Sequence, residues 1–185
     1  MATPDTNAFS NETYKRVVLL SVIGALALTL GSKLSLPFNP VPMTLQLLAM
    51  GLIVTFLPGR LVITSLVLWL AVGFVAPVHA MPGLTTVQVI SGPTGGYVLG
   101  MTFAACASIL MMTDAGKLLV ILFMTYFIGL IWLWGHVPAS QLLEFGFFPL
   151  ITADAFQIAL ALFLGLKLSE ARDRLRAWAF GPPGR

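Results

Sequence analysis

Six long apolar stretches, which together make up most of the 185 residues, constrain the fold of this sequence more than any other feature. They lie at residues 17–32, 41–57, 61–76, 93–112, 118–134 and 149–166. A helix needs roughly 17–25 apolar residues to cross a lipid bilayer, and these stretches are of about that length. Only 9% of the residues are charged, whereas soluble domains carry about 25%. The sequence therefore predicts an all-α integral membrane protein with six transmembrane helices.

The connections between these stretches are short. The second and third stretches, which are themselves short for a full span, are separated only by Pro58, Gly59 and Arg60, and this spacing predicts a tight hairpin. Six spans and their loops use up most of the chain. We therefore expect one membrane domain at residues 17–168, a segment at 1–16 before it and a basic tail at 169–185 after it.

The positive charges are distributed unevenly over the predicted connections. Only Lys33 falls on one side, while the other nine Lys and Arg residues fall on the opposite side: Lys15, Arg16, Arg60, Lys117, Lys167, Arg172, Arg174, Arg176 and Arg185. Cytoplasmic connections are rich in Lys and Arg, so both termini are predicted to be cytoplasmic. This pattern favours a multi-pass protein of the bacterial inner cell membrane, with a tail near anionic lipid, and not a protein that binds nucleic acid.

Asp154 is the acidic side chain that lies well inside an apolar stretch. A carboxylate at the bilayer centre costs about 2.5–3.5 kcal/mol on insertion scales, so such a residue normally faces a cavity or a partner. Gln157 follows three residues later and projects from the same helix face. The pair predicts a site for a polar ligand, and a structural hydrogen bond between helices is the alternative.

A second motif, Ser-Gly-Pro-Thr-Gly-Gly-Tyr at residues 91–97, precedes the fourth apolar stretch. Pro93 is typical of a first helical position. Gly95 and Gly96 then fall in the first turn, where each costs about 1 kcal/mol relative to alanine. Close approach of a ligand or of another helix would explain them, and Thr94 and Tyr97 add polar groups to the same turn.

A third motif, Pro-Val-Pro-Met-Thr-Leu-Gln at residues 40–46, predicts an extended segment that leads into the second helix. Thr44 and Gln46 are expected in the first turns of that helix. All three motifs then lie at a similar depth on the outer side. We predict that they form one substrate-binding site.

Other functional classes find little support in the sequence. No Walker loop and no Cys/His cluster with metal spacing occurs, and Cys106 is the one cysteine, so we predict no metal, cofactor or catalytic residue. His79 and His136 lie in outer loops, where histidines are usually solvated. An intramembrane enzyme would require one of them near Asp154.

The first apolar stretch carries small residues on one face, including Ser21, Ala25 and Thr29. Such faces allow helices to approach closely. Packing within the chain and docking against a partner subunit are both consistent with this pattern.

Together these motifs resemble the BioY family, the biotin-binding S components of energy-coupling-factor (ECF) transporters. The resemblance extends over about residues 16–168 and rests on residues 40–46, residues 91–100 and an aspartate early in the last helix. It implies an outward biotin pocket in which Asp154 accepts ureido N–H bonds. It also implies an ECF transmembrane coupling subunit and ABC-type ATPases as partners, with the small residues of the first helix as the docking face.

Two positions differ from the family pattern. A lysine usually stands where this chain has Gln157, and a glycine-rich stretch where it has residues 79–86. An S component for another small polar heterocycle or vitamin is therefore an alternative. A purely structural subunit is a further one.

Overall fold

The structure is a computed structural model that describes residues 6–37 and 39–180, with side chains from residue 11 onward. The ends of the two predicted terminal segments, residues 1–5 and 181–185 with Arg185, lie outside the described residues. The longer helices are α1 (Thr6–Lys33), α2 (Gln46–Phe56), α3 (Gly59–Val72), α5 (Gly95–Ser108), α6 (Asp114–Trp134), α8 (Phe148–Lys167) and α9 (Ser169–Phe180). The short elements are β1 (Ser35–Leu36), β2 (Met43–Thr44), α4 (Thr86–Ser91), η1 (Ala139–Gln141) and α7 (Leu142–Gly146).

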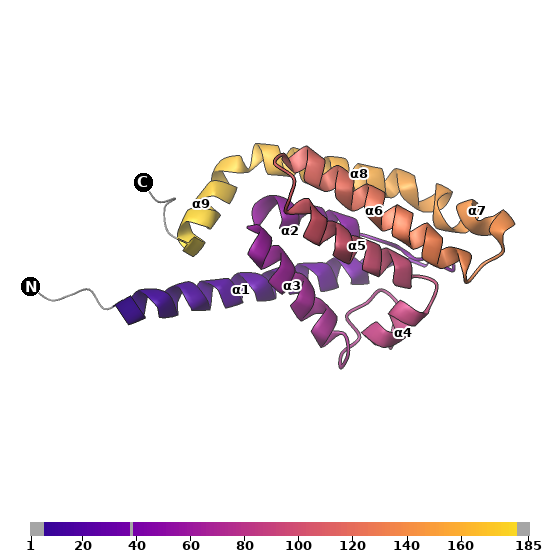
Figure 1. Ribbon diagram of the computed structural model, residues 1–185, viewed down its shortest axis with the longest axis horizontal. Coiled ribbons are helices and arrows are strands. Elements are labelled where there is room, and N and C mark those ends of the chain that lie inside the picture. The colour runs from indigo at the N-terminus through magenta and orange to yellow at the C-terminus, as the bar shows by residue number, and fades with distance from the viewer. Residues whose placement is uncertain (1–5, 38, 181–185) are drawn as a thin grey trace, which may run out of the picture.

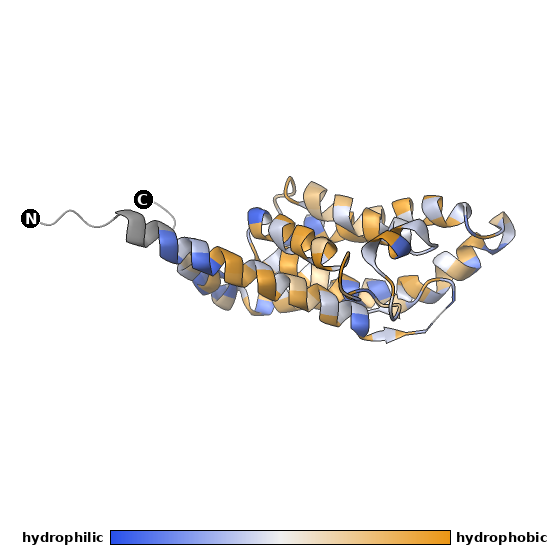
Figure 2. Cartoon of the chain, turned by 90° about the horizontal axis from the view of Figure 1, so that it is seen from below, coloured by the Kyte–Doolittle hydropathy of each residue, from blue (hydrophilic) through white to orange (hydrophobic). Residues whose placement is uncertain are grey.

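Each of the six apolar stretches contains a helix, so the prediction of a helical membrane protein is confirmed. Within the part of the chain that the structure describes, three segments are long and apolar enough to cross a membrane, namely Asn11–Lys33, Asp114–Trp134 and Ala139–Lys167. The helices α2, α3 and α5 have 11, 14 and 14 residues, fewer than a full span needs. Apolar residues dominate the middle of the molecule, and hydrophilic residues gather toward its ends (Figure 2).

The segment before α2 differs from the prediction. Residues 43–44 form β2, which pairs antiparallel with β1, and the helix begins only at Gln46. Thr44 therefore lies in a strand and not in a helical turn. The pairing with β1 explains the difference, because it holds Met43 and Thr44 extended beside Leu36 and Ser35.

Two of the predicted loops contain short helices. In the loop before α5, Thr85 and Gln88 form a capping box that starts α4, with the Gln88 Oε1 accepting from the Thr85 N–H at 2.9 Å. The helix α5 then begins at Gly95, two residues after Pro93, the predicted start. The helix α7 interrupts the loop before α8.

The helices pack as pairs at close distance. A Cβ atom on Gly100 of α5 would lie 2.8 Å from the Met124 carbonyl oxygen of α6, and one on Gly51 of α2 would lie 2.8 Å from the Ala161 Cβ of α8. Only glycine allows backbones this close. Small residues of this kind are typical of helix contacts in membranes.

The two ends of the molecule differ (Figure 1). One end, called here the terminal end, holds α9, the α2–α3 turn and the α5–α6 link, and α1 begins toward it. There the Arg16 Nη1 donates to the Trp178 carbonyl oxygen at 2.7 Å and ties α1 to α9. The opposite end, called here the loop end, holds α4, α7 and the β1–β2 pair.

Candidate functional site

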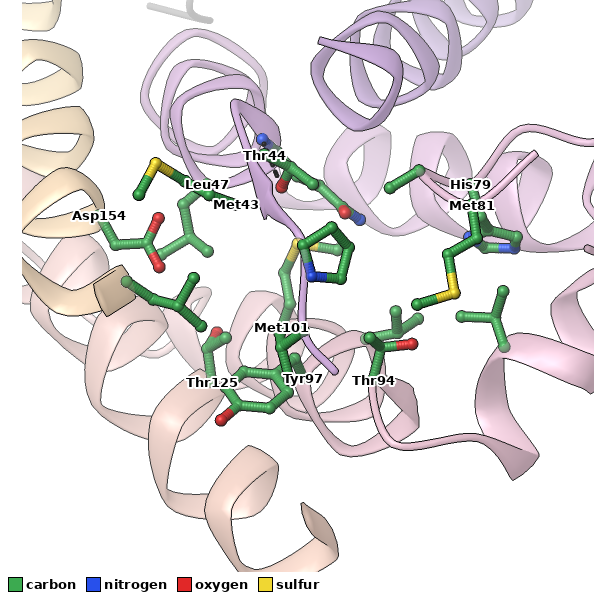
Figure 3. A pocket seen from close by; sticks show the side chains of 17 residues that line it. Met43, Thr44, Leu47, His79, Met81, Thr94, Tyr97, Met101, Thr125 and Asp154 are labelled. Atoms are coloured by element: carbon green, nitrogen blue, oxygen red, sulfur yellow. Dashed lines mark hydrogen bonds between the residues drawn. The ribbon is translucent and has the colours of Figure 1, made fainter. Parts of the chain in front are cut away.

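A cavity of about 670 Å³, including the part open to solvent, lies toward the loop end. Much of the lining is apolar and includes Met43, Met81 and Met101. The polar lining residues are Thr44, Gln46, His79, Thr94, Tyr97, Thr125 and Asp154. Figure 3 shows Asp154 on one side of the cavity and His79 and Met81 on the opposite side.

Asp154, on α8, is 9% exposed, and uncharged groups hold its carboxylate. The Tyr126 hydroxyl donates to the Asp154 Oδ2 at 2.6 Å, and the Gln157 Nε2 donates to the Asp154 Oδ1 at 3.0 Å. Among the described residues, no Lys, Arg or His lies within ion-pair distance of this carboxylate. The carboxylate therefore keeps acceptor capacity for a donor that enters the cavity.

Gln157 differs from its predicted role. It does not line the cavity, because its amide is committed to protein atoms. Besides Asp154, its Nε2 donates to the Thr44 carbonyl at 2.9 Å, and its Oε1 accepts from the Leu48 N–H at 3.0 Å. Gln157 thus positions Asp154 and fastens the β2–α2 segment to α8, and a direct contact with a ligand would require these bonds to break.

Two polar atoms of the cavity lining have no partner. The Gln46 Nε2 and the Thr125 Oγ1 are buried and form no hydrogen bond with any residue that the structure describes. Buried polar groups are nearly always hydrogen-bonded, so these two atoms are free for a ligand. Gln46 was selected from the sequence and Thr125 was not.

Tyr97 and Thr94 also line the cavity, as the third side of the predicted site. The Tyr97 hydroxyl donates to the Gly146 carbonyl at 2.7 Å, so the residue offers mainly its ring to the cavity. That ring meets the Tyr126 ring edge to face, with centroids 6.0 Å apart. The two tyrosines form an aromatic wall beside Asp154.

Gly95 and Gly96 do not line the cavity. A Cβ on Gly95 would overlap the Ile90 carbonyl, and one on Gly96 would overlap the Trp132 side chain of α6. Of the two explanations that the sequence left open for these glycines, close packing is the one that this geometry supports. The prediction that they contact substrate does not agree with it.

His79 is buried, 3% exposed, although its position in a loop predicted a solvated side chain. The Thr86 hydroxyl donates to the Leu70 carbonyl at 3.0 Å, so it must accept from the His79 Nε2 at 2.8 Å. Burial, followed by the charge of Lys33, lowers the pKa of His79 to about 4. His136 is exposed and bonds the Ser91 and Trp132 carbonyls outside this cavity.

Sequence reasoning missed Tyr126, which makes the shortest bond to Asp154. A signal was present, because Tyr126 is the one tyrosine in the apolar stretch at residues 118–134. Its hydroxyl needs a partner when it is buried there. Which partner it finds depends on how α6 and α8 pack.

The predicted docking face on α1 packs inside the chain. Ser21 and Ala25 are buried, and the Ser21 hydroxyl lies 2.7 Å from the Thr64 hydroxyl of α3. Thr29 is partly exposed, and its hydroxyl donates to the Ala25 carbonyl at 2.9 Å. Packing within the chain therefore accounts for Ser21 and Ala25, and docking of a partner at Thr29 stays a prediction.

Comparisons with known proteins agree with this architecture. The chain is 29% identical to the biotin transporter BioY2 of Lactococcus lactis subsp. cremoris (strain MG1363), a match over 82% of this chain and 89% of the relative. It is 30% identical to the probable biotin transporter BioY of Pyrococcus horikoshii, over 83% of this chain and 96% of the relative.

A solved structure shares the fold. The crystal structure of the S-component for biotin from an ECF-type ABC transporter superposes with a TM-score of 0.70, at 21% identity, over 92% of this chain and 95% of that one. The model of the BioY family matches residues 5–174. The chain therefore belongs to the BioY family.

Proposed function

We propose that this chain is the substrate-binding S component of a vitamin uptake transporter and that it captures biotin from the outer side of the membrane. The observation that carries the proposal is the Asp154 carboxylate, which is buried, held by uncharged donors and open to a cavity. The two relatives described as biotin transporters support biotin as the ligand.

Biotin would bind with its ureido group at Asp154. Each ureido N–H would donate to a carboxylate oxygen, and such charge-assisted hydrogen bonds are among the stronger ones. The free Gln46 amide and Thr125 hydroxyl are placed in the lining for further polar contacts. The apolar ring and side chain of biotin would contact the methionines and Tyr97 of the cavity. The carboxylate of biotin would lie at the other side of the cavity, toward His79. Lys33 is close to that side, because its Nζ donates to the His79 carbonyl at 2.6 Å.

In the proposed topology, six helices cross the bacterial inner membrane, and both termini are cytoplasmic. The terminal end, where the sequence places most cations, would then face the cytoplasm, and the loop end would face outward. Residues 17–168 form the membrane domain between the segments at 1–16 and 169–185. Energy would come from an ECF transmembrane coupling subunit and ABC-type ATPases, since the sequence has no nucleotide-binding loop.

Direct binding of labelled biotin to the purified chain tests this function. We expect saturable binding below micromolar concentration. Biotin at 100 times its Kd should also raise the free energy of unfolding by about 2.7 kcal/mol. Competition with other vitamins separates biotin from another heterocycle, and the absence of both binding and stabilisation would contradict the proposal.

A further inference from the structure

A second cavity lies at the terminal end and shares no lining residue with the biotin site. Its volume is about 560 Å³, including the part open to solvent. The ends of α2, α3, α5 and α6 surround it, and α9 contributes Arg176. Two cations, Lys117 and Arg176, line it beside apolar side chains such as Leu57 and Ile109.

Arg176 has no acidic partner at this cavity. Its Nε donates to the Phe56 carbonyl at 3.2 Å and its Nη2 donates to the Thr55 carbonyl at 2.9 Å, which caps the last turn of α2. No carboxylate of the described residues lies within 4.0 Å of its guanidinium. Burial, and then the charge of Arg172, lowers the pKa of Arg176.

The partly buried carboxylate of this cluster, Asp114, is already shared. The Asp114 Oδ2 accepts from the Arg172 Nη1 at 2.6 Å, and the Asp114 Oδ1 accepts from the Lys117 Nζ at 3.1 Å. Three partly buried cations, Arg172, Lys117 and Arg176, are therefore balanced by the partly buried Asp114 and by the exposed Asp173, whose Oδ1 accepts from the Arg172 Nε at 3.4 Å. A partly buried cation without a counterion is costly, so the cavity has an electrostatic need for an additional anion.

The surroundings indicate what kind of anion this is. The α5–α6 link beside the cavity exposes Ile109 at 43%, Leu110 at 80% and Met112 at 99%. Apolar side chains exposed next to Lys and Arg are typical of the boundary between headgroups and acyl chains. A small soluble anion would match the cations but would leave the apolar walls and rim uncovered.

We propose that this cavity binds the headgroup phosphate of an anionic phospholipid of the cytoplasmic leaflet. The phosphate oxygens would accept from Arg176 and Lys117, and an acyl chain would cover the apolar rim at Ile109 and Leu110. The inference depends on the terminal end lying at the membrane surface. It does not depend on the identity of the ligand at the loop end.

Lipid competition on the purified full chain tests the proposal. The chain is equilibrated in mixed micelles of phosphatidylglycerol and phosphatidylcholine, and the lipids that stay bound are counted by native mass spectrometry. We expect wild type to retain phosphatidylglycerol preferentially. Each of Arg176→Gln and Lys117→Gln should weaken this preference about fivefold, because a cation near an anionic headgroup contributes roughly that factor.

The matched control is Arg174→Gln, which removes the same charge from α9 at a position that does not line the cavity. The Arg174 side chain is 83% exposed and lies 3.6 Å from Glu170. We expect this variant to keep the preference, and an equal loss in all three variants would overturn the proposal. Thermal unfolding of Lys117→Gln, which leaves the cap on α2 intact, separates lost binding from lost folding.

A competitor distinguishes the source of the phosphate. Inorganic phosphate or glycerol phosphate at millimolar concentration should not displace the bound lipid, because neither covers the apolar rim. Displacement by either one would overturn the lipid assignment in favour of a soluble anion. Retention of phosphatidylcholine as strongly as phosphatidylglycerol would also overturn it.

Discussion

Two aspartates at opposite ends of the molecule are stabilised in different ways. Asp114, the first residue of α6 at the terminal end, lies between Arg172 and Lys117, with nitrogen–oxygen distances of 2.6 and 3.1 Å. Asp154, on α8 toward the loop end, has the Tyr126 hydroxyl and the Gln157 amide as its donors. Of the two, only Asp154 borders the mainly apolar cavity toward the loop end.

The difference separates a structural carboxylate from a binding one. The charge of Asp114 is compensated within the chain, so its role is complete when the helices have packed. The charge of Asp154 is bonded but not compensated, and burying such a charge in an apolar protein is unfavourable. The fold retains this cost beside a cavity, and a ligand with N–H donors would recover part of it.

The largest expected effect is the loss of biotin binding in Asp154→Asn. The amide keeps the size of the side chain but cannot accept two hydrogen bonds at full strength. Hydrogen bonds to charged groups contribute about 1.5–3 kcal/mol each, so the Kd for biotin should rise about 100-fold. Isothermal titration calorimetry measures the change.

Asp114→Asn is the matched control for this prediction. It makes the same chemical change at the compensated aspartate, outside the lining of the biotin cavity. We expect its Kd for biotin to equal that of wild type. Equal losses of affinity in the two variants would show that the comparison between the two aspartates is wrong.

The next effect concerns Tyr126, which holds the Asp154 Oδ2 at 2.6 Å. Tyr126→Phe keeps the ring and removes this bond, so the carboxylate is less well positioned. We expect affinity for biotin to fall about tenfold, within the range for one hydrogen bond to a charged group. Tyr97→Phe, whose hydroxyl bonds Gly146 instead, should leave the Kd within about twofold of wild type.

A third effect should appear in stability and not in binding. Asp114→Asn leaves Arg172 and Lys117 without their shared anion. These side chains are 18–20% exposed, so we expect a loss of about 1 kcal/mol in the free energy of unfolding. Thermal unfolding at low and high salt measures it, and a loss that does not shrink at high salt would contradict an ionic origin.

Much of this arrangement follows from local sequence signals. The apolar stretches mark where the helices lie, since each is long enough to pack or to span. Asp154 stands out because a carboxylate in such a stretch is rare, and Gln46 stands out as an amide near the start of one. Both side chains line the cavity that the structure forms.

The remainder depends on contacts between residues that are far apart in the sequence. The bond between Tyr126 and Asp154 joins residues 28 positions apart, and the bond from Gln157 to the Thr44 carbonyl spans 113 positions. Periodicity cannot indicate such pairs. The short helices of the outer loops, and the burial of His79 under Thr86 and Trp69, have the same origin in tertiary packing.

The smallest effect tests whether His79, across the cavity from Asp154, is a neutral part of the fold (Figure 3). Its pKa is about 4 in the folded chain and 6.5 when unperturbed, so the unfolded chain binds more protons between these values. The contribution of neutral His79 to the free energy of unfolding is therefore present above pH 6.5 and is lost as the pH falls toward 4. Lowering the pH from 7 to 6 should cost about 0.7 kcal/mol. In thermal unfolding, His79→Gln should remove this dependence of stability on pH. His136→Gln, at the exposed histidine, should keep it. Loss of the pH dependence in His136→Gln but not in His79→Gln would contradict the burial of a neutral His79.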